Sequence, residues 1–251
     1  MTRRRFYAPL TSFTPDGKSV LLAADEARHL RDVLRLKQGD EVFVFDGAGR
    51  EVQCAVAEVR RDLTHLEIVR EAEPARPESP MKLTLGVALL KSDKFDLVVQ
   101  KVTELGVAAI VPLVTKQADI RFRDDSDASK RVTRWQRIAL ESSKQSGRAV
   151  VPQVFMPAAF DLFVQRDESS TRLLFSERDG QSLLDMKHEL PEKLPLMVAV
   201  VGPEGGWTDA ELSLARDNNW TIVTIGGRTL RAETAAITAT ALLQHLFGDL
   251  T

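Results

Sequence analysis

The chain has 251 residues, enough for two modest domains that each bury a hydrophobic core. Its composition is 43% hydrophobic and 28% charged, and its net charge of −2 argues against a protein that wraps nucleic acid over most of its surface. The longest apolar run, residues 194–201, is less than half of what a membrane-spanning helix needs and contains Pro195. We therefore expect a globular protein without a membrane span.

The cysteine and histidine content indicates a cytoplasmic protein without a metal site. Cys54 is the single cysteine, which excludes an intrachain disulfide and a cysteine-based zinc site and suits a reducing compartment. The basic residues at the start of the chain are followed by prolines rather than by an apolar segment, so no export signal is expected. No metal-ligand spacing connects the four histidines, which are His29, His65, His188 and His245.

Residues 1–73 are predicted to form a small, mostly β domain. The pairs Gly39-Asp40 and Asp46-Gly47 tolerate the left-handed backbone that tight turns require. One helix is expected to begin near Asp25, whose carboxylate precedes the periodic apolar residues. We interpret this domain as a small barrel. Alternating polar and apolar residues predict its strands at 19–22, 41–46, 51–59 and 63–69.

A linker and an α/β domain are predicted behind the first domain. Residues 71–80 contain three prolines and three glutamates, and we place the linker at 74–80 and the second domain at 81–251. Beyond it, apolar β-branched runs alternate with amphipathic stretches, the pattern of a parallel sheet with helices on both faces. Strands are predicted at 83–90, 107–114, 173–175, 196–201 and 221–225. Helices are predicted from Asp93, over 128–146 and over 233–247.

The densest glycine cluster follows the predicted strand 196–201. Gly202, Gly205 and Gly206 surround the carboxylate of Glu204, and a helix is expected to begin behind the capping residue Thr208. Ligands of open α/β sheets bind outside the carboxyl ends of the strands, and glycine lets the backbone approach a ligand closely. The spacing matches neither a phosphate-binding loop nor a dinucleotide fingerprint. We interpret this turn as a binding loop of another kind.

A second strand end has the same form. The strand 221–225 is followed by Gly226 and Gly227, and then by Arg231 and Glu233 at the start of the last helix. Glu233 gains from the helix macrodipole whether or not it has a function, whereas a cation such as Arg231 gains nothing there. Two such turns from neighbouring strands predict one pocket.

Local basic clusters are candidates for contact with a polyanion. The spacing of Arg28, Arg31 and Arg35 by three and four residues predicts one helical face. Each cluster is equally compatible with a solvated surface. A second cluster consists of Arg3, Arg4 and Arg5.

Five segments of the chain follow one another in an order typical of one enzyme family. Residues 29–35 with Gly39-Asp40 resemble its first-domain signature, and residues 101–106 resemble the segment before its second strand. Residues 141–148, which end in Arg148, resemble a helix end, and the two glycine turns are similar to the cofactor loops. On these segments the chain resembles the RsmE family of the SPOUT, or trefoil-knot, methyltransferases over essentially its whole length. Departures from the residues usual in the family are Ser142, Thr229 and Ala232.

The resemblance implies a PUA-like β barrel in front of a knotted α/β methyltransferase domain, and a homodimer. It implies S-adenosylmethionine as cofactor and N3-methylation of a uridine in 16S ribosomal RNA of the assembled small subunit. The implied cofactor-binding residues are Phe175, Val201, Gly202, Pro203, Glu204, Gly205, Gly206, Ile225, Gly226, Leu230 and Arg231. The residues expected to bind RNA are Arg3, Arg4, Arg5, Arg28, Arg31, Arg35 and Arg148.

Methylation at N3 requires the loss of a proton that uracil holds at neutral pH, so a positioned base is needed. Glu204 and Glu233 are the carboxylates predicted at the pocket, and Arg231 could stabilise the uracil anion through its carbonyl oxygens. These three residues are the predicted catalytic residues. No cysteine lies near the turns, so the covalent route of carbon-methylating enzymes is not expected.

Two other functions remain open from the sequence. A nicotinamide- or nucleotide-binding oxidoreductase could use the same α/β frame, although no Gly-x-Gly-x-x-Gly follows the early strand. A non-catalytic RNA-binding assembly factor is the other, although it would not need Glu204, Arg231 and Glu233 together. A serine hydrolase is excluded because the chain has no Gly-x-Ser-x-Gly elbow.

Overall fold

The computed structural model describes residues 3–91, 93–118, 120, 122–166, 170–191 and 194–250, and the chain divides into two compact units. The first unit runs to Glu78 and includes Ser143–Val151, and the second consists of Ser79–Ser142 with the chain from Pro152 onward. Most of the predicted linker, residues 74–80, therefore packs with the first unit, and a segment from the middle of the sequence completes that unit. Independently folding domains at 1–73 and 81–251 stay a prediction.

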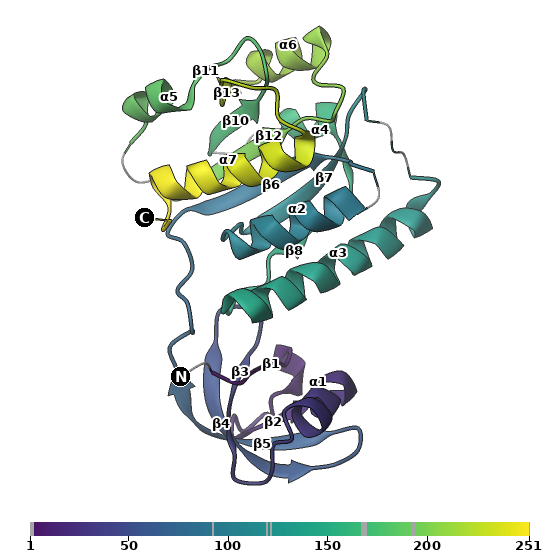
Figure 1. Ribbon diagram of the computed structural model, residues 1–251, viewed down its shortest axis with the longest axis vertical. Helices are drawn as coiled ribbons and strands as arrows, with labels where there is room; N and C mark the ends of the chain where they lie inside the picture. The colour runs from purple at the N-terminus through teal and green to yellow at the C-terminus, as the bar shows by residue number, and fades with distance from the viewer. Residues whose placement is uncertain are drawn as a thin grey trace. The chain divides into compact units, whose positions relative to one another are not determined.

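The first unit is built on a five-stranded, curled sheet (Figure 1). Its strand order is β1-β3-β4-β5-β2, with β1 parallel to β3 and the other neighbours antiparallel. Gly39 and Gly47 have positive φ angles of 88° and 82°, as predicted for the turns. Cys54 lies in the core, where burial raises the pKa of its thiol to about 12. The strands are β1 (Arg5–Tyr7), β2 (Ser19–Leu22), β3 (Glu41–Phe45), β4 (Glu51–Val59) and β5 (Thr64–Ala72).

The helix of the first unit begins near Asp25 as predicted, but Asp25 does not cap it. Helix α1 (Ala24–Arg28) has no side-chain cap, and Asp25 lies inside its first turn rather than in front of it. A π-helical turn, His29–Val33, follows directly and buries Leu30 in the core of the unit. The segment therefore turns from a short α-helix into a wider coil within ten residues.

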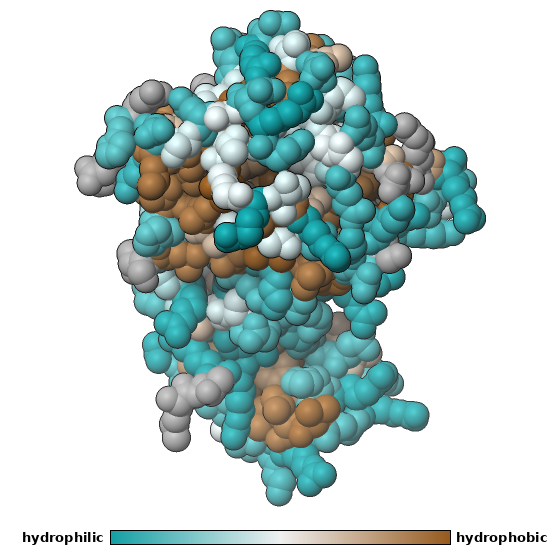
Figure 2. Space-filling view, turned by 45° about the horizontal axis from the view of Figure 1, so that its top comes forward, coloured by the Kyte–Doolittle hydropathy of each residue, from teal (hydrophilic) through white to brown (hydrophobic). Residues whose placement is uncertain are grey.

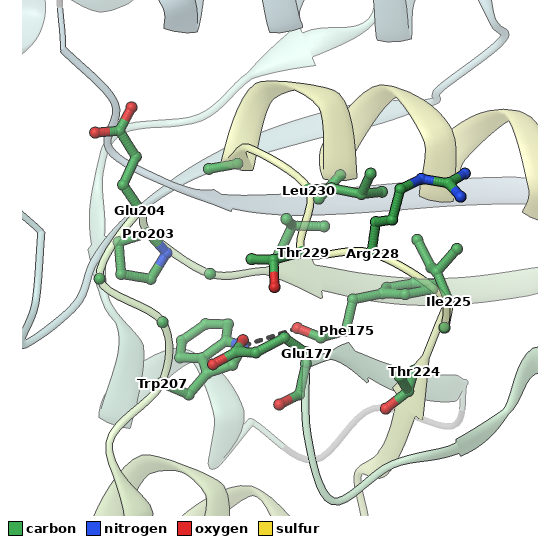
Figure 3. A pocket seen from close by; sticks show the side chains of 18 of the residues that line it. Phe175, Glu177, Pro203, Glu204, Trp207, Thr224, Ile225, Arg228, Thr229 and Leu230 are labelled. Atoms are coloured by element: carbon green, nitrogen blue, oxygen red, sulfur yellow. Dashed lines mark hydrogen bonds between the residues drawn. The ribbon is translucent and has the colours of Figure 1, made fainter.

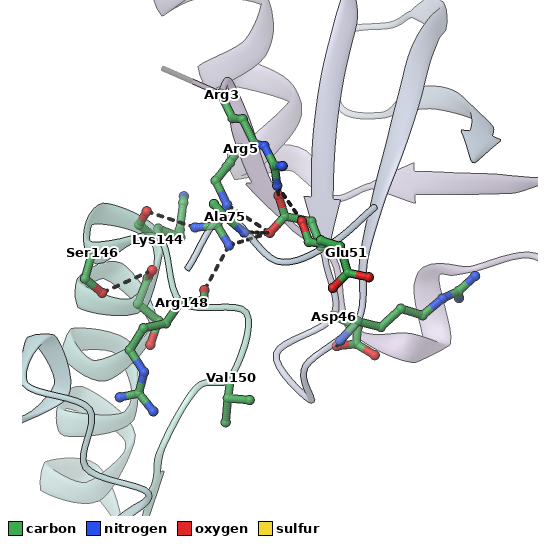
Figure 4. A network of polar contacts seen from close by, with 12 residues as sticks. Arg3, Arg5, Asp46, Glu51, Ala75, Lys144, Ser146, Arg148 and Val150 are labelled. Carbon is green, nitrogen blue, oxygen red and sulfur yellow. Dashed lines mark hydrogen bonds and ion pairs between the residues drawn. The ribbon is translucent and has the colours of Figure 1, made fainter. Parts of the chain in front are cut away.

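A buried carboxylate lies where the start of the chain meets β4. The Glu51 side chain is fully buried and accepts hydrogen bonds from the guanidinium groups of Arg3 and Arg5, each at 2.9 Å (Figure 4). It also accepts one from the backbone N–H of Ala75 at 3.2 Å. Donors from three residues thus converge on one carboxylate, which compensates for its removal from water.

The same guanidinium group of Arg5 attaches the late segment to the first unit. It donates to the carbonyl oxygens of Lys144 and Arg148, at 3.3 and 2.9 Å. These carbonyls lie at and just beyond the C-terminal end of α3 (Asp125–Ser146), where unpaired carbonyls favour a cation. The Arg148 side chain in turn forms an ion pair with Glu78 at 2.6 Å. Residues 143–151 are therefore held by charge-assisted hydrogen bonds.

Replacing Glu51 with glutamine is expected to lower the free energy of unfolding of the first unit by about 3 to 5 kcal/mol, because it leaves a buried guanidinium without its counter-charge. Urea denaturation followed by circular dichroism measures the change. Glu71→Gln is the matched control, since Glu71 pairs with Arg50 on the surface and its side chain is 67% exposed. It is expected to cost no more than about 1 kcal/mol. Equal losses in the two variants would show that the burial of Glu51 contributes nothing.

The second unit is a parallel sheet in the order β11-β13-β10-β12-β6-β7-β8, with β9 paired to β7. Every strand and helix predicted beyond the linker is present. The strands are β6 (Lys82–Ala88), β7 (Ala109–Val114), β8 (Gln153–Val154), β9 (Ala158–Ala159), β10 (Thr171–Phe175), β11 (Gln181–Ser182), β12 (Leu196–Val201) and β13 (Thr221–Thr224). The helices besides α3 are α2 (Asp93–Glu104), α4 (Phe160–Val164), α5 (Leu183–Glu189), α6 (Asp209–Asp217) and α7 (Ala232–Phe247).

Helices cover the strands of the second unit and explain their continuous apolar character. Helices α2 and α7 pack against each other, and α7 contacts β12 (Figure 1). Helices α4 and α6 also contact each other, and their residues Phe163 and Leu212 share a buried cluster with Val198 and Val200 of β12. In the described part of the chain no helix combines the length and the apolar character that crossing a membrane requires.

Candidate active site

Three parallel strands end side by side at one edge of the second unit's sheet. Strand β10 lies between β12 and β13 and runs parallel to both, so the three carboxyl ends meet. A pocket of about 390 Å³ lies at these ends, a volume that suits a small-molecule ligand. Its walls come from the segments that follow the three strands, within residues 175–177, 201–207 and 224–235 (Figure 3).

Trp207 joins two of these segments. Its indole N–H donates to the carbonyl oxygen of Phe175 at 2.8 Å, and the residue is only 3% exposed. The ring packs against Phe160 of α4, with ring centroids 4.7 Å apart. The turn after β12 is therefore tied to the end of β10 by a buried hydrogen bond.

The far end of the same turn is held by the capping residue predicted at Thr208. The Thr208 hydroxyl accepts from the backbone N–H of Glu211, and the Glu211 carboxylate accepts from the N–H of Thr208 at 2.9 Å. Glu211 is buried, and its other oxygen accepts from the N–H of Lys116 at 3.0 Å. Helix α6 thus begins where the sequence predicted, and the turn is fixed at both ends.

The glycines of the first turn are required by contacts inside the protein. A β-carbon at Gly202 would lie 2.9 Å from the Trp207 indole. One at Gly206 would lie 2.7 Å from the end of the flexible Glu177 side chain, and the positive φ of 74° is what favours glycine at this position. The interpretation that these glycines leave room for a ligand is therefore incomplete, because protein side chains occupy that room.

The glycines of the second turn are required by backbone conformation. Gly226 and Gly227 have φ angles of 82° and 77°, and a β-carbon at either would meet no atom within 4 Å. A side chain in this left-handed region costs about 1 to 2 kcal/mol. The segment continues through Leu230 to Arg231, the N-cap residue of α7.

All but one of the residues predicted to bind the cofactor line the pocket. The exception is Arg231, which is exposed, although its neighbours Leu230 and Ala232 line the pocket. The predicted residues that line it are Phe175, Val201, Gly202, Pro203, Glu204, Gly205, Gly206, Ile225, Gly226 and Leu230.

The two predicted catalytic carboxylates lie at one lysine. Lys94, in the first turn of α2, forms an ion pair with Glu204, and its Nζ lies 3.8 Å from Oε2 of Glu233. The Glu204 carboxylate extends away from the Trp207 side of the pocket (Figure 3). Glu233 lies in the first turn of α7, and its side chain is 12% exposed. Its Oε2 has no hydrogen bond within the described residues.

Two charged residues of this region were missed by the sequence analysis. Glu177 lines the pocket, and its position could have been inferred, since it follows the end of β10 by two residues at the same edge of the sheet. Lys94 is harder than Glu177 to infer from the sequence. It is a cation at a helix start, where the macrodipole disfavours positive charge.

Two of the arginines predicted to bind RNA are buried in ion pairs. The side chains of Arg5 and Arg148 are 7% and 6% exposed, and their carboxylate partners are Glu51 and Glu78. Arg3, whose side chain is 33% exposed, also pairs with Glu51. This geometry favours a structural role for these arginines within the first unit.

The other four predicted arginines lie on the surface of the first unit. Arg4, Arg28 and Arg35 are exposed, and Arg31 is hydrogen-bonded to Asp32. Helix α1 ends at Arg28, a π-helical turn follows, and Arg35 has a positive φ of 54°. The single helical face predicted from their spacing is therefore wrong, because a π turn holds more residues than an α turn.

Comparison with known proteins matches both units. A family model described as an RNA methyltransferase domain matches residues 77–244, and one described as an RNA methyltransferase PUA domain matches residues 22–69. Ribosomal RNA small subunit methyltransferase E of Synechocystis is 34% identical, over 91% of this chain and 73% of that protein. The protein of the same name from Bacillus subtilis is 28% identical, over 96% of each chain.

Two solved structures align with the whole chain. Ribosomal RNA small subunit methyltransferase E from Neisseria gonorrhoeae, bound to S-adenosylmethionine, has a TM-score of 0.87, 34% identity and full coverage of both chains. Lpg2936 of Legionella pneumophila, also solved with S-adenosylmethionine, has a TM-score of 0.88, 31% identity and the same coverage.

The curled N-terminal sheet, the parallel sheet and the pocket at its strand ends define an RNA methyltransferase with a PUA-like domain. Within that class, the chain belongs to the ribosomal RNA small subunit methyltransferase E family, the RsmE family. The predicted fold class and enzyme class are confirmed. The knot and the roles of individual residues stay predictions.

Gly206→Ala is expected to weaken binding of S-adenosylmethionine and to lower the Tm, because the new methyl group combines a left-handed backbone with a clash against Glu177. Calorimetric titration and thermal unfolding measure the two effects. Gly17→Ala is the matched control, since Gly17 has a φ of 68° and open space around it in the first unit. Unchanged cofactor affinity in Gly206→Ala would contradict a tightly packed turn.

Proposed function

We propose that this chain transfers a methyl group from S-adenosylmethionine to N3 of a uridine in 16S ribosomal RNA of the small ribosomal subunit. The pocket at the carboxyl ends of β10, β12 and β13, lined by two glycine turns, is the observation that carries the proposal in a chain of this family. The names of its relatives support the ribosomal substrate.

The residues of the pocket fit the cofactor. Phe175, Ile225 and Leu230 offer apolar surface, and the two turns offer backbone N–H and carbonyl groups. Glu177 adds a carboxylate, which suits a ligand that carries positive charge. S-adenosylmethionine supplies, when bound, a methyl group on a positively charged sulfur. The two solved relatives described above hold this molecule.

The charged groups beside the pocket fit proton removal from N3. A carboxylate positioned as a base contributes roughly 10²- to 10⁴-fold to such a step. Glu204 and Glu233 are available for it, and Arg231 at the start of α7 can donate hydrogen bonds to the oxygens of the uracil anion. A target base splayed out of its stack would reach these groups.

RNA contact is assigned to the exposed arginines of the first unit. Arg4, Arg28 and Arg35 are exposed, and a few phosphate contacts suffice to position RNA without a large net charge. A reducing cytoplasm suits both the buried thiol and a ribosomal substrate.

We further infer a homodimer in which α7 contributes to the contact. Helix α7 is rich in alanine and threonine, and Ile237, Ala241 and Leu242 stay partly exposed. Figure 2 shows a broad apolar area on the side of the molecule where α7 runs in Figure 1. Two copies would double the RNA-binding surfaces and favour one rigid, folded substrate over short flexible RNA.

The test is methyl transfer by the purified protein to small subunits taken from cells that lack the corresponding gene. We expect one 3-methyluridine per subunit, identified by mass spectrometry of the digested 16S RNA, and slower transfer to naked RNA of the same sequence at matched salt. Light scattering reports the dimer. Tight binding of subunits without methyl transfer would instead support a non-catalytic assembly factor.

Joint replacement of Arg28 and Arg35 by alanine is expected to weaken RNA binding and to flatten its salt dependence, by about one unit of slope for each lost phosphate contact. The control is Arg60→Ala with Arg70→Ala, which removes two exposed arginines of the same unit. Filter binding over a salt series gives both slopes. The same slope in both double variants would mean that Arg28 and Arg35 only face solvent.

A further inference from the structure

Three charged side chains from three different segments meet at the rim of the pocket. Lys94 comes from the first turn of α2, Glu204 from the turn after β12, and Glu233 from the first turn of α7. Glu204 itself lines the pocket, as do Ala232 and Ala235 on either side of Glu233. One ammonium group is thus shared by two carboxylates at the place where substrate would enter.

Stability does not account for this arrangement. Ion pairs between side chains as exposed as Lys94 (31%) and Glu204 (39%) contribute little, because water and salt screen them. Lys94 is also the second residue of α2, where the helix macrodipole disfavours a cation. Two carboxylates beside one ammonium repel each other. The cluster costs more than an ordinary surface pair, which points to a use in the reaction.

The two carboxylates are not equivalent. Glu204 is in direct contact with the ammonium, so its charge is already matched. Glu233 is the more buried, with 12% of its side chain exposed against 39% for Glu204. Its Oε2 lies 3.8 Å from the ammonium and has no hydrogen bond within the described residues. That oxygen lies close to the positive charge and, because it has no hydrogen bond there, can accept a proton.

Helix α2 and strand β12 both contact α7, and the charged groups of these two elements lie on α2. Strand β12, which contacts α7, contains no charged residue. On α2, Asp96 pairs with Arg134, and Asp93 is exposed at the first position. Arg231 caps α7 two residues before Glu233. The remaining pair of α2 is Lys101 with Glu104, at the far end of the helix.

We propose that Lys94, anchored by Glu204, is a positioning residue of the methyl transfer, whose ammonium holds the Glu233 carboxylate in place as the base for uridine N3; this rests on the proposed function. The N3–H proton moves to Oε2 of Glu233. The electron pair left on N3 forms the bond to the methyl carbon. The pair of the broken carbon–sulfur bond stays on sulfur, which becomes a neutral thioether.

The experiment compares Lys94→Met with Lys94→Arg in the full-length protein, by single-turnover methylation at saturating cofactor over a range of subunit concentrations. Lys94→Met is expected to lower the maximal rate, by less than the roughly 10²- to 10⁴-fold that the base itself contributes. The subunit concentration that gives half the maximal rate should stay unchanged, because Lys94 acts on the base and does not bind the substrate. Lys94→Arg keeps the charge and is expected to retain most of the rate.

Two further variants separate this role from a structural one. Lys101→Met is the matched control, since Lys101 lies on the same helix with 40% of its side chain exposed and pairs with Glu104. It is expected to leave the maximal rate unchanged. Glu233→Gln should lower the maximal rate roughly 10²- to 10⁴-fold. Adding Lys94→Met to Glu233→Gln should then change the rate by no more than about twofold, because Lys94 acts through Glu233.

The outcomes distinguish failure of the proposed function from failure of the inference about Lys94. A wild-type protein that transfers no methyl group contradicts the proposed function and, with it, the inference. With an active wild type, the inference alone fails if Lys94→Met matches Lys101→Met, or if it changes the half-saturating subunit concentration and leaves the maximal rate unchanged. It also fails if Lys94→Arg is as slow as Lys94→Met, or if the loss persists undiminished in the Glu233→Gln background.

Discussion

The hydrogen bond from the Trp207 indole to the Phe175 carbonyl is the contact on which the pocket depends. It joins the turn after β12 to the end of β10, and the capping box of Thr208 and Glu211 fixes the other end of the turn. Because the bond is buried, breaking it would leave a carbonyl unsatisfied at a cost of about 1 to 3 kcal/mol. A turn held at both ends presents its backbone in one geometry, so a ligand has little ordering to do.

The arginines of the first unit fall into two groups, which differ in how deeply their side chains are buried. Arg5 and Arg148 are enclosed and face carboxylates and carbonyl oxygens of their own unit. Planar guanidinium groups suit such sites because they donate in several directions at once. Arg28 and Arg35 extend into solvent and keep their donors available to a polyanion. A net charge close to zero is therefore compatible with RNA binding, since a few exposed arginines can contact phosphates locally.

Much of the second unit could be predicted because parallel strands impose their own pattern. Apolar runs located the long strands, and glycines beyond two of them located the pocket. What escaped prediction depends on contacts between distant residues. Glu51 pairs with Arg5 across 46 positions, so nothing near Arg5 distinguished it from an RNA-binding arginine. Likewise, the need for glycine at position 202 arises from where the Trp207 ring packs. Short strands such as β8 and β11 have two residues each, too few for an alternating apolar pattern to reveal them.

The position of Ser143–Val151 in the first unit bears on how the chain folds during its synthesis. Strands β1 to β5 are made first, yet the carbonyl oxygens of Lys144 and Arg148 that Arg5 binds emerge only after β6, β7 and α3. Until then the Arg5 guanidinium lacks these two acceptors. The first unit is therefore translated first but completed late. Its last residues, Ser143–Val151, are made when the nascent chain is about twice as long as Met1–Glu78.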